Sequence, residues 1–269
     1  MDVKNTRERL DKLLVDRGIS TTRERARALI MSGVVSVGDC LVDKPGVLVP
    51  WNGEVRIRGD DNPYVSRGGL KLKGTLLTFG ISVKDLVVLD VGASTGGFTD
   101  CLLQEGAGKV YALDVGYGQL AWKLRQDRRV TVIERTNIRY FDGDGIHDGI
   151  DMAVIDTSFI SLKLVIPPVL KLIKDGATIL ALIKPQFEVG REDVGRGGVV
   201  RSPDLQRKVV LEMVAFCRGL DLDVIGTCES SLLGPAGNRE FFIYAKKLGL
   251  RGAKGKRHKV AFKLNSRLL

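Results

Sequence analysis

Short apolar runs alternate with segments of helical periodicity over most of the chain after residue 66. The runs expected to form strands are 86–90, 110–114, 130–134, 153–156, 177–184, 224–228 and 240–245. The segments expected to form helices are 70–79, 98–104, 119–125, 161–173 and 203–218. Strands that alternate with helices in this way predict a parallel α/β sheet, closed by the two final strands.

The first 59 residues have a different pattern, because two short helices come before short β segments. Apolar residues at helical spacing predict a helix over 7–17, and a capping box of Thr21 and Glu24 starts a second helix that ends at Gly33. Strands are expected at 34–37, 46–49 and 54–58. Two helices on a small sheet indicate a separate α+β module.

A break in periodicity separates this module from the rest of the chain. Residues 60–63, Asp-Asp-Asn-Pro, have the composition of a linker. We therefore expect four parts, namely a small α+β domain at 1–59, a linker at 60–65, an α/β domain at 66–247 and a C-terminal tail at 248–269.

Composition is typical of a soluble globular protein, since 44% of the 269 residues are hydrophobic and can bury a sizeable core. No apolar run approaches the roughly 18 residues of a membrane span. The first ten residues carry charges where a signal peptide needs an apolar core, so we expect a cytoplasmic protein. The four cysteines lack Cys-x-x-Cys spacing, and His147 and His258 stand alone, so neither disulfides nor a metal site is indicated.

Positive charge is concentrated at the C-terminus. Residues 246–269 contain nine Lys or Arg and no acid, so they carry nine of the ten net positive charges, and 33 basic residues face 32 acidic ones elsewhere. Such an arm can bind the phosphate backbone of a nucleic acid, or it can be a solvated end that aids solubility. The sequence leaves both interpretations open.

The segment 90–97, Asp-Val-Gly-Ala-Ser-Thr-Gly-Gly, joins a predicted buried strand to a helix. Glycines here allow a tight turn and a close approach of the backbone to a ligand. A P-loop would need Gly-Lys-Ser/Thr, a dinucleotide turn would need glycine at Ser94, and Asp90 would repel phosphates. Asp90 favours a cationic ligand such as S-adenosylmethionine, and Asp114 at the end of the next strand can accept both ribose hydroxyls. In the alternative interpretation, both aspartates only cap turns.

Four charged residues lie where an otherwise apolar sheet would not place them, namely Lys71, Asp156, Lys184 and Glu240. Asp156 and Lys184 follow strands, so they should face the same crevice as Asp90, because ligands of open α/β sheets bind at the carboxyl ends of the strands. Two lysines in one dry cleft disfavour each other's charged form, so one of them can act as a base while carboxylates orient both. In the alternative interpretation, these residues form exposed ion pairs of little energetic value.

Residues 9–58 resemble the S4 RNA-binding domain. The matching motifs are RLDxxLVxRG at 9–18, TRxxAxxLIxxGxVxV at 22–37 and VxKP at 42–45, whereas Gly38-Asp39 stands where the family usually has Asn-Gly. The resemblance implies an RNA partner, held by arginines that contact phosphates and read shape. The arginines assigned to this role are Arg9, Arg17, Arg23, Arg25, Arg27 and, beyond the linker, Arg67. A charged helix face can also be only a solvated face.

Nearly the whole chain resembles the TlyA-type methyltransferases, also called the haemolysin A family, whose catalytic domain is like that of the FtsJ-type ribose 2′-O-methyltransferases. The resemblance is carried by VSRGGxKL at 65–72, GASTGGFT at 92–99, DVGYGQLAW at 114–122, ERTN at 134–137, DxSFISL at 156–162, KPQFEVG at 184–190 and GNxE at 237–240. It implies a Rossmann-like domain that binds S-adenosyl-L-methionine through Asp90, Gly92, Ala93, Ser94, Gly96, Gly97, Phe98, Asp114 and Asn137. It also implies a Lys-Asp-Lys-Glu catalytic tetrad, which maps onto Lys71, Asp156, Lys184 and Glu240.

The same resemblance implies methylation of a ribose 2′-hydroxyl, with cytidine as the nucleoside, in ribosomal RNA or ribosomal subunits and without a metal. Lys184 would act as general base, Lys71 would help to hold the oxygen, and Asp156 and Glu240 would fix both lysines. One alternative is a catalytically silent RNA-binding protein, against which the intact tetrad speaks. The other is a haemolysin-like membrane-active protein, which would need an apolar span or a strongly amphipathic membrane helix.

Overall fold

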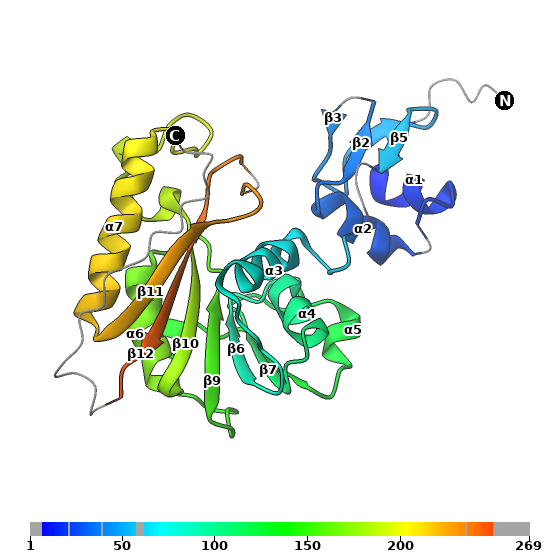
Figure 1. Ribbon diagram of the computed structural model, residues 1–269. Helices are drawn as coiled ribbons and strands as arrows, with labels where there is room; N and C mark the ends of the chain where they lie inside the picture. The colour runs from blue at the N-terminus through cyan, green and yellow to red at the C-terminus, as the bar shows by residue number, and fades with distance from the viewer. Residues whose placement is uncertain (1–6, 21, 39, 58–61, 235, 250–269) are drawn as a thin grey trace. The chain divides into compact units, whose positions relative to one another are not determined.

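The computed structural model describes residues 7–20, 22–38, 40–57, 62–234 and 236–249 (Figure 1). The chain divides into two compact units, Met1–Gly68 and Gly69–Leu269. The predicted cap at Thr21, most of the basic tail and part of the predicted linker lie outside the described residues.

The first unit combines two helices with short antiparallel strands. β1 (Arg7–Arg9) pairs with β4 (Leu48–Pro50), and β2 (Val35–Val37) pairs with β3 (Cys40–Leu41) and β5 (Val55–Ile57). The helices are α1 (Leu10–Asp16) and α2 (Arg23–Met31). Its core consists of Leu10, Leu13, Leu14, Ala26, Leu29, Ile30, Val35 and Val49. The α+β character expected for this part of the chain is therefore confirmed.

Two details of the first unit differ from expectation. Residues 7–9 form a strand instead of the first turn of a helix, because β4 offers them a partner. Thr22, not Thr21, is the N-cap of α2, and its hydroxyl accepts a hydrogen bond from the backbone N of Arg25 at 3.1 Å. The extended backbone of Thr22 brings its hydroxyl over the first turn of the helix, which is what an N-cap requires.

The second unit is a seven-stranded mixed sheet with helices. Its strands are β6 (Val87–Val91), β7 (Lys109–Leu113), β8 (Val130–Ile133), β9 (Ile150–Ile155), β10 (Ile173–Ile183), β11 (Leu222–Glu229) and β12 (Phe241–Lys247). Its helices are α3 (Arg67–Phe79), which starts at the boundary, α4 (Gly97–Gln104), α5 (Trp122–Arg125), α6 (Leu162–Leu172) and α7 (Pro203–Gly219), with 3₁₀ turns η2 (Ile138–Tyr140), η3 (Pro185–Phe187) and η4 (Arg191–Asp193). The strand order is β11-β12-β10-β9-β6-β7-β8.

The order and direction of the strands agree with the Rossmann-like domain that the sequence resemblance implies. The five strands from β10 to β8 are parallel, as the alternation predicts. β12 lies between β10 and β11 and is antiparallel to both, because the short connection from β11 to β12 contains no crossover helix. The reversal at β12 brings the start of that strand to the same edge as the ends of the parallel strands.

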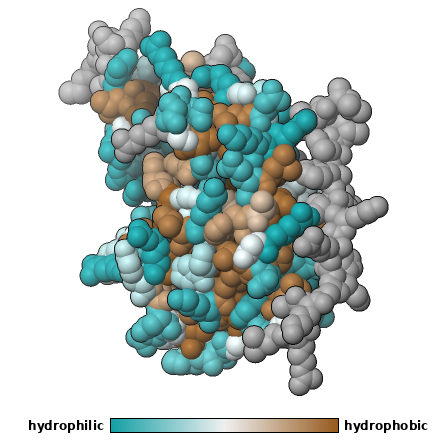
Figure 2. All heavy atoms as spheres, turned by 90° about the vertical axis from the view of Figure 1, so that its left-hand side faces the viewer, coloured by the Kyte–Doolittle hydropathy of each residue, from teal (hydrophilic) through white to brown (hydrophobic). Residues whose placement is uncertain are grey.

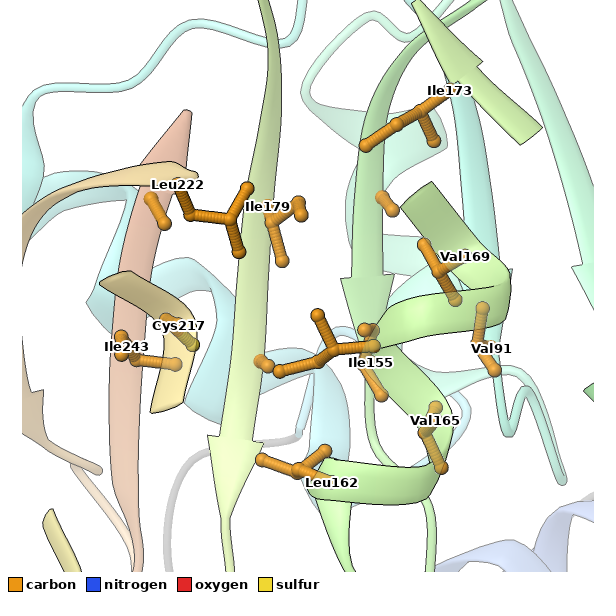
Figure 3. Close-up of a cluster of buried hydrophobic side chains, with 14 of the residues drawn as sticks. Val91, Ile155, Leu162, Val165, Val169, Ile173, Ile179, Cys217, Leu222 and Ile243 are labelled. Carbon is orange, nitrogen blue, oxygen red and sulfur yellow. The ribbon is translucent and has the colours of Figure 1, made fainter. Parts of the chain in front are cut away.

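The packing of α6 fixes the carboxyl ends of the central strands. Figure 3 shows Leu162, Val165 and Val169 of α6 gathered near Ile155 of β9 and Val91 of β6, all in one buried cluster. The side that carries α7 and β11 has hydrophilic residues with smaller hydrophobic areas between them (Figure 2).

Candidate active site and cofactor pocket

A pocket of about 1000 Å³ opens at the carboxyl ends of the parallel strands. Its walls come from the segments that follow β6, β7, β8 and β9, which is where ligands of open α/β sheets bind. The predicted site residues that line it are Gly92, Ser94, Asp114, Asn137 and Asp156. Residues that sequence reasoning did not assign also line it, among them Gln119, Thr136, Arg139, Ser158, Phe159 and Phe187. Most of these lie within or beside the family motifs, which is the signal that could have identified them.

The glycines of the 92–97 loop have different structural reasons. Gly92 has φ 85°, and a Cβ on it would lie 2.6 Å from the carbonyl oxygen of Asp156, so only glycine fits between the two strand ends. Gly96 has φ 97° and faces the side chain of Leu124, so it allows the loop to pack on α5. Gly92 thus allows the loop to approach the end of β9 at the pocket, and Gly96 allows it to pack on α5.

Asp114 joins the glycine loop to the loop that follows β7. Its Oδ2 accepts a hydrogen bond from the backbone N of Ser94 at 2.8 Å, and its Oδ1 accepts one from the backbone N of Gly116 at 2.6 Å. Ser94 has φ 48°, a left-handed conformation that is uncommon for a residue other than glycine. The carboxylate therefore holds a strained turn in place while it lines the pocket.

Asp90 lies beneath the loop instead of on the pocket wall. Its side chain is fully buried, and Oδ2 accepts a hydrogen bond from the hydroxyl of Thr99 at 2.6 Å. Oδ1 is buried without a hydrogen-bond partner among the described residues. Burial, with a smaller effect from Asp156 and Asp114, raises the pKa of the Asp90 carboxyl to about 7. A buried acceptor with an unused oxygen next to the pocket fits a site for a ligand that brings positive charge.

Other predicted cofactor residues also support the loop from inside. Ala93, Gly97 and Phe98 are buried and, with Gly96, lie outside the pocket lining. The ring of Phe98 stacks on Phe242 with 6.1 Å between centroids, so it belongs to the core between α4 and β12. A motif position does not distinguish a residue that lines the pocket from one that supports its wall.

The four tetrad residues form two ion pairs. Lys71 of α3 places its Nζ 2.5 Å from Oε2 of Glu240, and both side chains are buried. Lys184 places its Nζ 2.6 Å from Oδ1 of Asp156 and donates a hydrogen bond to Oγ of Ser158 at 2.9 Å. Ser158 is part of the DxSFISL motif, but the sequence did not indicate that it is a partner of Lys184.

The sheet register brings the two ion pairs together at the carboxyl ends of the parallel strands. Ile183 and Phe241 are the last partners of the antiparallel pair β10–β12, so Lys184 and Glu240 are the next residues on the two strands. Asp156 follows the last residue of β9, which neighbours β10 on the other side. Gly234 lies so close to Oε1 of Glu240 that a Cβ there would displace the carboxylate. Two lysines and two carboxylates therefore meet beside the pocket, where they can hold a hydroxyl and accept its proton.

Phe159 stands at the rim of this site. Its side chain is 90% exposed, its φ is 62°, and its ring lies 5.2 Å from that of Phe187. A large apolar side chain held outward by a left-handed backbone is an outlier that often marks a binding site. Its ring face can stack on a flat ligand group.

The arginines assigned to RNA have structural partners in several cases. Arg9 and Arg23 place Nε 3.0 and 3.1 Å from the two carboxylate oxygens of the buried Asp11, and the hydrogen bond from Arg9, then that from Arg23, lowers the pKa of this carboxyl. Arg17 donates to the carbonyl oxygen of Gly53 at 2.7 Å. Arg25 and Arg27 are exposed on α2, and Arg67 is the first residue of α3. Arg9 and Arg23 thus stabilise the first unit as well as carrying charge.

Two negative findings concern the described residues alone. Within them, no group of three His, Cys, Asp or Glu side chains is arranged to hold a metal ion. Among the same residues, every helix is too short or too polar to span a bilayer.

Comparison with known proteins agrees with this geometry. The FtsJ-like methyltransferase family matches residues 64–247, and the S4 domain matches residues 8–55. TlyA of Mycobacterium tuberculosis, named a 16S/23S rRNA (cytidine-2′-O)-methyltransferase, is 44% identical over 241 residues, which are 89% of this chain and 90% of that protein. YqxC of Bacillus subtilis is 48% identical over 239 residues, 88% of this chain and 85% of that one. A solved structure of a hemolysin-named protein from Streptococcus thermophilus is 44% identical, covers 90% of this chain and 89% of that one, and has a TM-score of 0.72. The chain therefore belongs to the FtsJ-like methyltransferases of the TlyA, or hemolysin A, type, in which an S4 domain precedes the methyltransferase domain.

Proposed function

We propose that this protein transfers a methyl group from S-adenosylmethionine to the 2′-hydroxyl of a cytidine in ribosomal RNA. The observation that carries the proposal is the ion pair of Lys184 and Asp156 at the pocket wall, 2.6 Å between Nζ and Oδ1. The carboxylate orients Nζ at the carboxyl end of a strand, and the amine, once it has lost its own proton, can remove a proton from a hydroxyl next to a bound cofactor.

The pocket offers the groups that S-adenosylmethionine needs. Asp114 lines it with carboxylate oxygens that can accept ribose hydroxyls in addition to the backbone N–H groups they already bind. Asn137 lies at the wall where the adenine edge would reach, and the loop at Gly92 and Ser94 leaves room for the methionine end. Asp90 beneath the loop has a buried oxygen without a partner among the described residues, and a cationic cofactor nearby would favour its ionised form. When bound, the cofactor supplies an electrophilic methyl group.

The tetrad residues position and deprotonate the nucleophile. As the neutral amine, Lys184 takes the proton of the 2′-hydroxyl and becomes the ammonium ion, while Asp156 and Ser158 hold its Nζ in place. Lys71, held by Glu240, stabilises the negative charge that develops on the oxygen. The bond from this oxygen to the methyl carbon forms as the carbon–sulfur bond breaks, so in-line positioning provides much of the rate.

Ribosomal RNA is the substrate that the rest of the chain fits best. The chain has an S4 domain, and the relative from Mycobacterium tuberculosis is named for cytidine 2′-O-methylation of 16S and 23S rRNA. Phe159 at the rim can stack on a base that is turned out of its helix toward the site. An enzyme that acts on ribosomal RNA works where ribosomes are assembled, so we place it in the cytoplasm.

The test is to incubate the full chain and its Lys184→Ala variant with labelled S-adenosylmethionine and ribosomal subunits, and to map new 2′-O-methyl groups. The proposal requires label on ribose in the wild-type reaction and none with the variant. RNA binding without label would favour a catalytically silent RNA-binding protein. Label on a base instead of a ribose would refute the assigned chemistry.

A further inference from the structure

The segment between β10 and α7 begins at the tetrad residue Lys184 and forms hydrogen bonds close to a second tetrad residue, Glu240. It leaves β10 at Lys184 and ends where α7 starts at Pro203. In Figure 1 this segment and the connection from β11 to β12 both lie at the end of the second unit where β10 ends. Asn238, which is 2% exposed, lies in that connection two residues before Glu240.

Asn238 uses both ends of its amide to hold this segment. Its Nδ2 donates a hydrogen bond to the carbonyl oxygen of Gly198 at 2.8 Å, and its Oδ1 accepts one from the backbone N of Val200 at 2.9 Å. Gln206 of α7 adds a third bond, from Nε2 to the carbonyl oxygen of Val200 at 2.7 Å. Two buried amide side chains on two different elements thus fix the same stretch of backbone.

The turn that holds Asn238 also confines Glu240. The backbone N of Gly234 donates to the carbonyl oxygen of Asn238 at 2.8 Å, and Gly234 packs against the carboxylate of Glu240. The segment therefore starts at one tetrad residue, Lys184, and is fastened beside another, Glu240. Any group that it presents is held at a set position relative to the hydroxyl-binding site.

The fastened stretch presents guanidinium groups and open backbone. Arg196 and Arg201 are exposed and lie together, since Nη2 of Arg201 reaches the carbonyl oxygen of Arg196 at 3.4 Å. Neither forms an ion pair with an acid among the described residues, although Glu192 and Asp193 precede them in η4. Gly197 and Gly198 have φ of 81° and 77°, both are exposed, and a Cβ added to either would meet no other atom of the described residues within 4 Å. Guanidinium groups on an exposed turn can donate paired hydrogen bonds to the oxygens of phosphate groups.

We propose that Arg196 and Arg201 bind backbone phosphates of the RNA strand that enters the active site, and that Asn238 is the positioning residue that holds them beside the tetrad. This inference rests on the proposed RNA substrate. It adds an RNA contact in the methyltransferase unit to the one expected of the S4 unit. Phosphate contacts fix the register of a strand without reading its sequence, which is what a site needs to place one ribose against its base.

The first test compares two double variants with the same change of charge. Arg196→Gln with Arg201→Gln removes the two guanidinium groups. Arg128→Gln with Arg218→Gln is the control, since these exposed arginines precede β8 and β11 and so lie at the amino ends of the strands, away from the pocket. We expect the first pair to weaken ribosomal RNA binding about tenfold and to reduce the salt dependence by roughly one to two phosphate contacts. Affinity for S-adenosylmethionine should stay unchanged. Equal effects of the two pairs on RNA affinity would overturn the proposal.

The second test asks whether Asn238 acts through the arginines. Asn238→Ala should raise KM for RNA as the double arginine variant does, with kcat changed less, and adding it to that variant should raise KM no further. A fall in kcat at unchanged KM, or full additivity, would overturn the positioning role. Because the first test measures RNA affinity at equilibrium, its result stands apart from methylation: wild-type protein that binds RNA through these arginines without labelling ribose would refute the proposed function alone.

Discussion

Lys71 and Glu240 form a buried ion pair with 2.5 Å between Nζ and Oε2, although 169 positions separate them in the chain. α3 supplies the lysine, and the residue just before β12 supplies the carboxylate. The pair therefore ties the first helix of the methyltransferase unit to the beginning of β12, the antiparallel strand between β10 and β11. Removing one member of such a pair leaves a buried charge without compensation.

This pairing predicts that single substitutions destabilise the protein more than a double one. Glu240→Gln and Lys71→Met should each lower the free energy of unfolding by about 3 kcal/mol, as expected for an uncompensated buried charge. Lys71→Met combined with Glu240→Gln should recover part of that loss, because no charge is left buried. Urea unfolding of the four proteins measures the coupling, and additive losses would show that the two groups do not depend on each other. Methylation should stay low in all three variants, which separates stability from catalysis.

Lys184 should be essential for turnover and dispensable for binding. Lys184→Ala should lower kcat by about 10²- to 10⁴-fold, the range for loss of a general base, with nearly unchanged affinities for cofactor and RNA. Lys184→Arg should also fail, because a guanidinium keeps its proton at any working pH. Single-turnover methylation measures both, and substantial activity of Lys184→Arg at neutral pH would leave only electrostatic positioning for this residue. Ser158→Ala, which removes one hydrogen bond to Nζ, should cause a smaller loss.

The contrast between these residues shows what sequence reasoning can reach. Asp156 and Lys184 each follow an apolar run, and the rule that parallel strands end at one edge predicts that they share a site. The partnership of Lys71 and Glu240 has no such local signal, since one residue lies on a helix and the other starts a strand that reverses direction. Only the family motifs pointed to it.

Local patterns also gave no indication of contacts that depend on long-range packing. Phe98 follows the glycines of the loop, as a residue near a ligand would, but Phe242 draws it into the core. Arg23 lies on the exposed face of α2, but its guanidinium donates a hydrogen bond to Asp11, twelve positions earlier. Both contacts depend on a second element whose position the sequence pattern does not specify.

Asp114 should contribute to cofactor affinity in two ways, through the ribose and through the loops that it joins. Asp114→Ala should weaken binding of S-adenosylmethionine by about tenfold or more, because removing a hydrogen bond to a charged group costs about 1.5–3 kcal/mol. Asp114→Asn keeps one acceptor oxygen and should bind with intermediate affinity. Calorimetry without RNA gives both values. Unchanged affinity of Asp114→Ala would show that the ribose site is assigned wrongly.

Asp90 should make stability depend on pH near neutrality. Burial raises the pKa of its carboxyl in the folded protein from 3.8 to about 7, so between these values the folded state holds a proton that the unfolded state has released. The contribution of Asp90 to the free energy of unfolding therefore falls as pH rises from about 4 to about 7. Asn has no proton to release and resembles the protonated carboxyl, so Asp90→Asn should remove this dependence on pH. The variant should be more stable than wild type at pH 8 and of similar stability at pH 4. Urea unfolding at both pH values tests this, and an equal difference at both would contradict it.

The two units should fail in different ways when their charges are removed. A fragment that starts near Asn62 should still fold and bind S-adenosylmethionine, because the mixed sheet has a core of its own, but it should methylate ribosomal RNA poorly. Within the first unit, Arg25→Gln and Arg27→Gln should weaken RNA binding, since both side chains are exposed on α2 and add positive charge to its surface. Arg23→Gln should also lower stability, because Asp11 is buried and would lose one of its two guanidinium partners.

The basic tail is the competing explanation for RNA affinity, because most of the net positive charge lies beyond residue 245. A chain that ends at Lys247 tests this explanation. RNA affinity across a salt series should be compared for the full chain, the variant with Arg25→Gln and Arg27→Gln, and the shortened chain. Each lost phosphate contact should reduce the salt slope by about one. We expect the arginine variant to have a smaller slope than the full chain. If only the shortened chain changes the slope, the S4 unit is not the main anchor for RNA, and the basic tail takes that role.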